Sequence, residues 1–491
     1  MESGILVGLL DNKEPLKDGL QVLSCSVKDL LSSKINKQSN INISGQICIP
    51  EYQRPYVWKE KQIDCLLDDL LEYFNGKKEK SLYYLGSIII HREGSNLNII
   101  DGQQRLTTIL ILNSFLEDPI ISNISYNSPL SVRNIKRNHS YLKKLFLGEF
   151  HKFQNININE ILDLEKINVT LIITNSEDLA YTFFETQNTG GVRLSGSDII
   201  KSHHLRALKT KRRISYQATK WESFSSSKIE YVVEQLCKIR YWNNNNWRLF
   251  PFYRNEKGLK DTIIEEFSEK TSKEDNDTSH YFMTLKKENG KVYQHFESNY
   301  RQIRQPLYNG DNFLDYIHEY VNLFQILFDK DDDYKVALEF YDFRNKMLHG
   351  RDGTIYLKEL FQITLITYVS RFGFLRLYEV SLWLYRYIYS LRVSFNRNVR
   401  EDSIFKFVND KKIIDKILQS YTIDGLLNWL KKFDYNFDNN NISNNQSKGK
   451  HIASLKHYFG NFTTASQMSK NKVFDKVLIK SITEKIASYD N

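Results

Sequence analysis

The strongest constraint on this chain is a ten-residue segment in which an apolar strand passes directly into a helix. It reads Ile99-Ile100-Asp101-Gly102-Gln103-Gln104-Arg105-Leu106-Thr107-Thr108. The first N–H groups of a helix have no partner within the helix, and the helix dipole makes this end partly positive, so an anion is favoured there. Gly102 lets the backbone approach a ligand, the two glutamines offer amide hydrogen bonds, and Arg105 can hold a phosphate through two parallel bonds.

A purely structural interpretation of this segment stays open. Asp101 would then be the N-cap of the helix and would accept hydrogen bonds from its first turn. Arg105 would lie on a face of the helix that points to solvent. The five residues 101–105, taken alone, fit both interpretations equally well.

Composition narrows the class of protein. The chain has 491 residues, of which 41% are hydrophobic and 26% are charged, as in an ordinary globular protein of two or three domains. The net charge of +9 fits a nucleotide or nucleic-acid partner but establishes neither. Four cysteines without CxxC spacing indicate a reducing compartment, without disulfides or a zinc site. The N-terminal residues lack the pattern of a signal peptide and the apolar stretches are short, so a cytoplasmic protein that does not enter a membrane is expected.

Hydrophobic periodicity predicts an α+β fold with two domains. Residues 1–210 are expected to mix helices and strands, and residues 211–491 are expected to be mostly helical. The expected elements of the first part are helices over 59–74, 103–115, 176–184 and 195–208 and strands over 83–91, 97–100 and 168–174. Ser195 followed by Asp198 is typical of a capping box at the start of the last of these helices.

Two further motifs accompany the strand-to-helix segment. The first is Ile49-Pro50-Glu51-Tyr52-Gln53-Arg54-Pro55-Tyr56-Val57-Trp58, in which the prolines stiffen an extended backbone. The other runs from Phe184 to Lys201. Each motif alone has a structural explanation: an arginine paired with an acid, or a glutamate at a helix end. Their occurrence together, in this order, indicates a shared site.

The three motifs together resemble the N-terminal domain of the GmrSD-type restriction family, which has a ParB/sulfiredoxin-like fold. The family pattern comprises IPxYQRxYxW, (I/V)DGQQR and FExxNxxGxxLSxxDxxK. These blocks are matched at residues 49–58, 100–105 and 184–201. The resemblance covers about residues 20–210, and it implies a nucleotide-binding domain followed by a helical half.

The resemblance implies binding and hydrolysis of a nucleoside triphosphate by a GTPase-like enzyme. In this family the activity serves type IV-like restriction, an antiviral defence of prokaryotes against foreign and often modified DNA. By position in the motifs, the residues implied to bind nucleotide are Gln53, Arg54, Asp101, Gly102, Gln103, Gln104, Arg105, Asn188, Asp198 and Lys201.

Catalytic roles follow from what phosphoryl transfer requires, which is in-line geometry and neutralised charge. The residues implied are Asp101, Gln103, Gln104, Arg105 and Glu185. Asp101 or Glu185 would hold Mg²⁺. Gln103 or Gln104 would orient the attacking water. The sequence contains no GxxxxGK[ST] motif, so a P-loop NTPase is not expected.

Many members of the family carry an HNH nuclease domain after the helical region. Here only His451-Ile452 and Gly460-Asn461-Phe462-Thr463 resemble it, and Lys450 stands where an acid is expected. A metal-activated hydrolysis site does not fit this spacing. We therefore expect a separate HNH nuclease subunit as partner, with DNA as the shared target.

A rival site lies at Arg344-Asn345-Lys346-Met347-Leu348-His349, which resembles the ribonuclease motif of HEPN domains. Such a site would combine two copies of the chain, so a homodimer is among the expected partners. The structural alternative is a helix end followed by Gly350. Two alternatives to the NTPase thus stay open: a non-catalytic nucleotide- or DNA-binding regulator of a partner effector, and a HEPN-like ribonuclease toxin using Arg344 and His349.

Basic and aromatic residues also occur together within the helical half, at 238–242, 300–304 and 385–387. Surfaces of this composition suit nucleic-acid binding. Amphipathic helices with buried aromatics and solvated bases would produce the same pattern.

Overall fold

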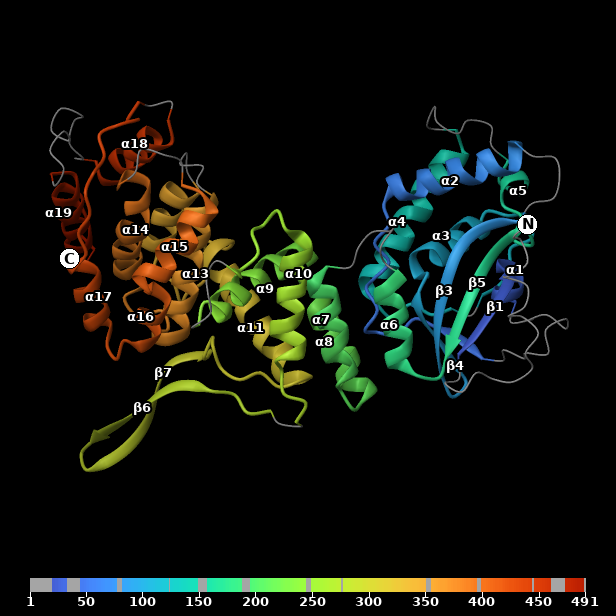
Figure 1. Ribbon diagram of the computed structural model, residues 1–491, viewed down its shortest axis with the longest axis horizontal. Coiled ribbons are helices and arrows are strands. Elements are labelled where there is room, and N and C mark those ends of the chain that lie inside the picture. The colour runs from blue at the N-terminus through green and yellow to red at the C-terminus, as the bar shows by residue number, and fades with distance from the viewer. Residues whose placement is uncertain are drawn as a thin grey trace, which may run out of the picture. The chain divides into compact units, whose positions relative to one another are not determined.

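The computed structural model describes residues 20–32, 45–76, 82–122, 124–148, 157–187, 195–243, 249–274, 277–349, 355–394, 399–443, 446–460 and 473–489 (Figure 1). The chain divides into two compact units. Unit 1 comprises Met1–Leu194 and Lys209–Ser223, and unit 2 comprises Ser195–Leu208 and Phe224–Asn491. Helix α7 (Gly196–Arg206) thus belongs to unit 2, whereas α8 (Lys211–Glu222) belongs to unit 1. The predicted α+β class is confirmed.

Unit 1 contains a five-stranded mixed sheet with the order β1-β5-β3-β4-β2. The strands are β1 (Gln21–Ser26), β2 (Gln46–Cys48), β3 (Tyr83–Glu93), β4 (Asn96–Asp101) and β5 (Ile167–Thr174). The predicted hairpin is confirmed as β3 and β4, which run antiparallel. β3 and β5 are parallel, and this pairing brings two segments far apart in sequence to the centre of the sheet. The ParB/sulfiredoxin-like arrangement stays a prediction.

Several helices accompany this sheet in unit 1, and the sequence periodicity predicted the apolar face of the one that covers residues 60–76. They are α1 (Val27–Leu31), α2 (Glu60–Gly76), α3 (Gln103–Asn113), α4 (Pro129–Phe146), α5 (Ile158–Ile161), α6 (Glu177–Gln187) and α8. In α2, Ile63, Leu67 and Leu70 are completely buried in the same core as the isoleucines of β3 and β4. Each such side chain contributes about 1.5–3 kcal/mol on burial. The core therefore holds β4 and the start of α3 firmly in place.

Unit 2 consists mainly of helices. They are α7, α9 (Ser226–Tyr241), α10 (Glu256–Ile264), α11 (Asp311–Phe328), α12 (Leu338–Phe343), α13 (Ile355–Phe372), α14 (Leu377–Ser394), α15 (Glu401–Lys411), α16 (Ile413–Gln419), α17 (Ile423–Lys432), α18 (Ser447–Phe459) and α19 (Val473–Ala487), with π-helical turns η2 (Glu265–Glu269) and η3 (Arg344–Leu348). α13 and α14 are buried along almost their whole length. Among the described residues, no helix has both the length and the apolar character needed to cross a bilayer.

One element of unit 2 was missed by the sequence interpretation. A two-stranded ribbon of β6 (Tyr281–Glu288) and β7 (Lys291–Arg301) extends from the helices (Figure 1). Part of the basic-aromatic stretch 300–304, which lies in the half expected to be mostly helical, is the end of β7. The overlooked signal is Asn289-Gly290, where both residues have positive φ, of 49° and 77°. Asn-Gly is the preferred pair for a two-residue hairpin turn.

Candidate functional site

The turn between β4 and α3 depends on Gly102. This residue is the N-cap of α3 and has a φ of +90°, which strongly favours glycine. A Cβ at this position would lie 2.8 Å from Cγ1 of Ile88 on β3. The sequence predicted that Gly102 lets the backbone approach a ligand. In the structure, the close approach of the backbone is to Ile88 of β3. Asp101 is not the N-cap, and the N-cap residue Gly102 makes no side-chain hydrogen bond to the first turn of α3.

Arg105 is held against β3. Its Nη1 donates to the carbonyl of Leu85 (3.0 Å) and its Nη2 donates to that of Ser87 (2.7 Å). An ion pair with Asp101, at 3.6 Å, adds to these bonds, and the Arg105 side chain is 29% exposed. The structural interpretation, with Arg105 on a solvated helix face, is thus also wrong. The Arg105 side chain therefore joins α3 to β3. Its binding of a phosphate stays a prediction.

Gly86 leaves the space in which the Arg105 guanidinium contacts β3. This glycine was not predicted from the sequence. The register of β3 shifts between Tyr84 and Gly86, where φ is +117°. A Cβ on Gly86 would lie 1.8 Å from Nη1 of Arg105. Glycine within an otherwise apolar strand is a known signal for a bulge or for a close approach, and here it marks both.

Asp101 lies in an unusual electrostatic environment. Burial raises the pKa of this carboxyl above its ordinary value, and Arg105, the N–H of Gly102 and Arg54 offset only part of the rise. The carboxyl side chain nevertheless keeps 23% of its surface exposed. A cation that binds beside it would therefore favour its ionised form.

The first two motifs are joined by glutamine side chains. Gln104 accepts a hydrogen bond from the N–H of Val57 (2.9 Å) and donates one to the carbonyl of Pro55 (3.0 Å). From the other side, Gln53 donates to the carbonyl of Ile100 (2.7 Å). Both ends of the Gln104 amide are thus used in positioning residues 55–57.

Gln103, the neighbour of Gln104, is in the opposite situation. Its side chain is buried, with the residue 5% exposed, and neither amide atom has a hydrogen-bond partner among the described residues. It lines a cavity of about 20 Å³ together with Gln53 and Arg54. That volume accommodates about one water molecule. Arg54 forms neither a hydrogen bond nor an ion pair with another described residue.

Helix α4 supports the first motif from outside. Ser131 accepts from the N–H of Tyr56 (2.9 Å), and Asn134 donates to the carbonyl of Tyr56 (2.7 Å). Asn138 donates to the hydroxyl of Tyr56 (3.0 Å) and to the carbonyl of Trp58 (2.8 Å). The sequence interpretation missed these residues. Their signal is a set of polar side chains at helical spacing on the buried face of a helix.

The third motif is described only in part. α6 packs against β3, β4 and β5, and the ring of Tyr181 lies 5.8 Å from that of Tyr52 in the first motif. The side chain of Glu185 and all of Asn188 lie outside the described residues. In unit 2, Asp198 forms the predicted capping box with Ser195, which is confirmed.

Lys201 is buried on the same helix as Asp198. The catalytic role of Glu185 and the nucleotide-binding roles of Asn188, Asp198 and Lys201 stay predictions. Within the described parts of the chain, no group of three or more His, Cys, Asp or Glu side chains is arranged to hold a metal ion. The Mg²⁺ assigned to Asp101 and Glu185 therefore stays a prediction as well.

Comparison with protein families supplies the identity of this region. Residues 27–205 match the family described as GmrSD restriction endonuclease, N-terminal domain. The chain contains a GmrSD-type N-terminal domain. All three motifs lie within the match, which relates the chain to restriction systems in general terms. Residues 213–446 match a family described as of unknown function, DUF7834. No match was found among curated proteins.

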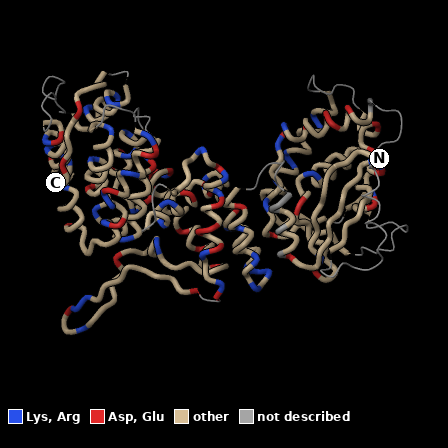
Figure 2. Tube along the Cα trace, in the orientation of Figure 1, with Lys and Arg blue, Asp and Glu red and all other residues tan. Residues whose placement is uncertain are grey.

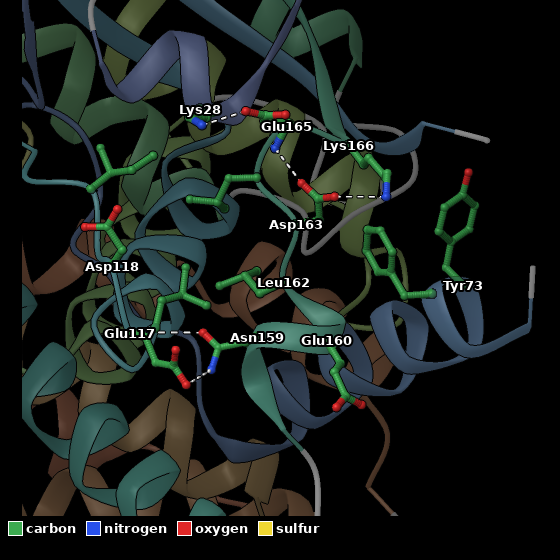
Figure 3. A pocket seen from close by; sticks show the side chains of 14 residues that line it. Lys28, Tyr73, Glu117, Asp118, Asn159, Glu160, Leu162, Asp163, Glu165 and Lys166 are labelled. Carbon is green, nitrogen blue, oxygen red and sulfur yellow. Dashed lines mark hydrogen bonds and ion pairs between the residues drawn. The ribbon is translucent and has the colours of Figure 1, made fainter. Parts of the chain in front are cut away.

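A larger, open pocket in the GmrSD-type domain does not suit a triphosphate (Figure 3). It has a volume of about 780 Å³, and none of the predicted site residues lines it. Its two lysines are already paired, Lys28 with Glu165 (2.6 Å) and Lys166 with Asp163 (3.0 Å). Its remaining charged side chains are acidic, so it would repel phosphate.

The rival ribonuclease motif covers η3 and His349, which follows it. Arg344 is 1% exposed and donates to the carbonyls of Leu327 (3.1 Å) and Lys330 (2.7 Å). It also pairs with Asp331. His349, in contrast, is exposed. Arg344 thus ties the end of α11 to η3, and a ribonuclease role stays a prediction.

The partial resemblance to an HNH domain falls on α18. His451 is buried in the middle of this helix and stacks on Tyr385 and Tyr389. An HNH centre requires its first histidine in a ββα unit. The residues around His451 form the single helix Ser447–Phe459, which differs from that arrangement, and residues 461–463 of the second segment lie outside the described residues.

Proposed function

We propose that the GmrSD-type domain binds a nucleoside triphosphate at the turn 101–105 and hydrolyses it in the restriction of foreign DNA. The observation that carries this proposal is Gln103, a buried amide without a partner at the uncapped start of α3. Leaving a buried amide unbonded costs about 1–3 kcal/mol, so such a group is retained where a ligand or water completes it. The family match supports the connection to restriction.

In this mechanism the phosphates lie at the start of α3, where the backbone N–H groups face the anion. Arg54 neutralises charge as it develops on the transferred group, because its guanidinium has no ion-pair partner among the described residues. Gln103 orients the attacking water in the small cavity that it shares with Arg54. Gln104 and Arg105 hold the loop in shape.

A Mg²⁺ ion would be held by Asp101 or Glu185 and would supply further charge neutralisation. The Asp101 carboxylate suits a hard cation, since it is an oxygen ligand that remains partly exposed. A separate nuclease subunit would then cut the DNA, while the domain described here powers or gates the response.

The test is hydrolysis of GTP and ATP by the purified full chain. We expect Arg54→Ala to lower the rate by about 100-fold, the usual effect of removing a group that stabilises transition-state charge. The matched control is Arg212→Ala, which removes an exposed arginine of α8 and should leave the rate unchanged. Equal rates in the wild type, Arg54→Ala and Arg212→Ala would refute the enzymatic proposal.

One observation favours a second function, a regulator that binds nucleotide without turnover. Arg105, a cation in the first turn of α3, is bonded to β3. Because the Arg105 guanidinium is bonded within the fold, less positive charge is available to stabilise the phosphates than the motif predicts. Saturable nucleotide binding that is lost in Arg54→Ala, together with no turnover in the wild type, would establish this alternative.

A further inference from the structure

Helix α4 carries a concentration of positive charge that the proposed nucleotide site does not use. Its 18 residues include five cations and no acid: Arg133, Lys136, Arg137, Lys143 and Lys144. All five are exposed. Figure 2 shows blue segments, which mark Lys and Arg, along this helix.

The spacing of these residues places them on one side of the helix. Counted from Arg133, they follow at 3, 4, 10 and 11 positions. At 100° per residue they fall within a sector of about 120°, and at 1.5 Å per residue they extend over about 16 Å. We call these five residues the α4 stripe.

The charge of the α4 stripe is not neutralised within the fold. None of the five forms an ion pair with another described residue. Only Arg137 is bonded through its side chain, to Asn138 (3.2 Å) and to the carbonyl of Trp58 (2.8 Å). Like charges three and four residues apart destabilise a helix. Five cations on one side of a helix, with no acid among them, therefore indicate that an anion from outside the fold binds there.

We propose that the α4 stripe binds the phosphate backbone of duplex DNA. A duplex carries one charge per 1.7 Å of its axis, so a stretch as long as the stripe offers about ten phosphates. A membrane is a poor alternative, because a helix lying on lipid needs an apolar face toward the acyl chains. The apolar residues Leu142 and Leu145 of α4 are buried in the core, and of its large apolar side chains Val132 alone, at 36%, counts as exposed among the described residues.

The buried side of α4 connects the stripe to the candidate site. Asn134 and Asn138 on that side hold the backbone of Tyr56 and Trp58, next to Gln53 and Arg54. DNA on the stripe would thus contact the helix that supports the nucleotide loop. The binding itself requires no nucleotide, so it can be tested separately from hydrolysis.

The experiment measures binding of a fluorescent 20-base-pair DNA duplex to the full chain, without nucleotide, over a series of salt concentrations. The test variant is R133Q/K136Q/K143Q/K144Q, which spares Arg137 because of its bond to Trp58. Each phosphate contact contributes about 0.9 to the slope of log affinity against log salt, so the slope should fall by about 3 to 4. At 0.1 M salt we expect at least about a tenfold loss of affinity.

The matched control is K257Q/K406Q/K432Q/K476Q. It removes the same charge from four exposed lysines on separate helices of unit 2 that pair with no described residue. Thermal unfolding confirms that both variants fold. A wild-type slope in the stripe variant, or an equal loss in the control, would overturn the proposal. So would stripe-dependent binding to phosphatidylserine vesicles without binding to DNA. Nucleotide hydrolysis, measured in parallel, reports separately on the proposed function.

Discussion

The turn 101–105 and the segment 344–349 both matched a motif with a chemical function, and both bury a polar side chain. They differ in how that side chain is bonded. Arg344 has partners inside the fold on both sides of its guanidinium, whereas the amide of Gln103 has none. Buried polar groups in proteins are almost always bonded. A satisfied group therefore indicates a structural role, and an unsatisfied one indicates a missing ligand or water.

The largest effect that we expect from this comparison is on stability, at Arg344. Arg344→Ala would leave the carbonyls of Leu327 and Lys330 without their donor and should lower the free energy of unfolding by about 3 kcal/mol. Chemical denaturation of the full chain measures it. The control is Lys346→Ala, which removes an exposed ion pair with Asp342 and should change stability by less than about 1 kcal/mol. A neutral Arg344→Ala together with lost ribonuclease activity would support the HEPN alternative instead.

A smaller loss of stability is expected from a substitution of Gly86, which leaves room for the Arg105 guanidinium. Gly86→Ala forces a side chain onto a backbone with φ of +117° and into contact with Arg105, which should cost about 2 kcal/mol. In the double variant with Arg105→Ala the clash disappears and only the backbone strain remains. Chemical denaturation of the two single variants and the double variant measures the interaction free energy between positions 86 and 105. Additive losses would show that Gly86 and Arg105 do not interact as described.

The smallest expected effect is a dependence of stability on pH. It comes from His204 of unit 2, another buried polar side chain that is hydrogen-bonded within the fold. His204 is bonded at both ring nitrogens, to the carbonyl of Phe267 (2.6 Å) and the N–H of Gly310 (3.3 Å). Only a neutral ring can accept and donate in this way. Burial, and to a lesser degree His203, lower the pKa of His204 well below its ordinary 6.5.

The unfolded chain therefore binds a proton near pH 6.5 that the folded chain does not. The stability contributed by His204 is complete above that pH and declines as pH falls below it, by about 1.4 kcal/mol per unit. Denaturation at pH 7.5, 6.5 and 5.5 measures the loss, and His204→Gln should lessen it. An equal pH dependence in His204→Gln would show that other groups cause it.

The elements around the site were predictable because their signals are local. Apolar runs on either side of a turn, a glycine and a helical period were enough to place β3, β4 and the start of α3. The bonding of the side chains was not predictable, because it depends on distant segments. Arg105 meets carbonyls of β3, and Gln104 meets residues 55–57. Adjacent glutamines point about 100° apart around a helix, and the sequence does not show which of them is bonded.

The most direct test of the central claim compares Gln103→Met with Gln104→Met in both stability and GTP hydrolysis. The substitutions are identical and fall on adjacent residues of one helix. Gln104→Met removes the partners of Val57 and Pro55 and should lower the free energy of unfolding by about 2 kcal/mol. Gln103→Met removes an unbonded buried amide, so stability should stay the same or rise by about 1 kcal/mol while hydrolysis is lost. A Gln103→Met variant that is as destabilised as Gln104→Met and still hydrolyses GTP at the wild-type rate would contradict the claim.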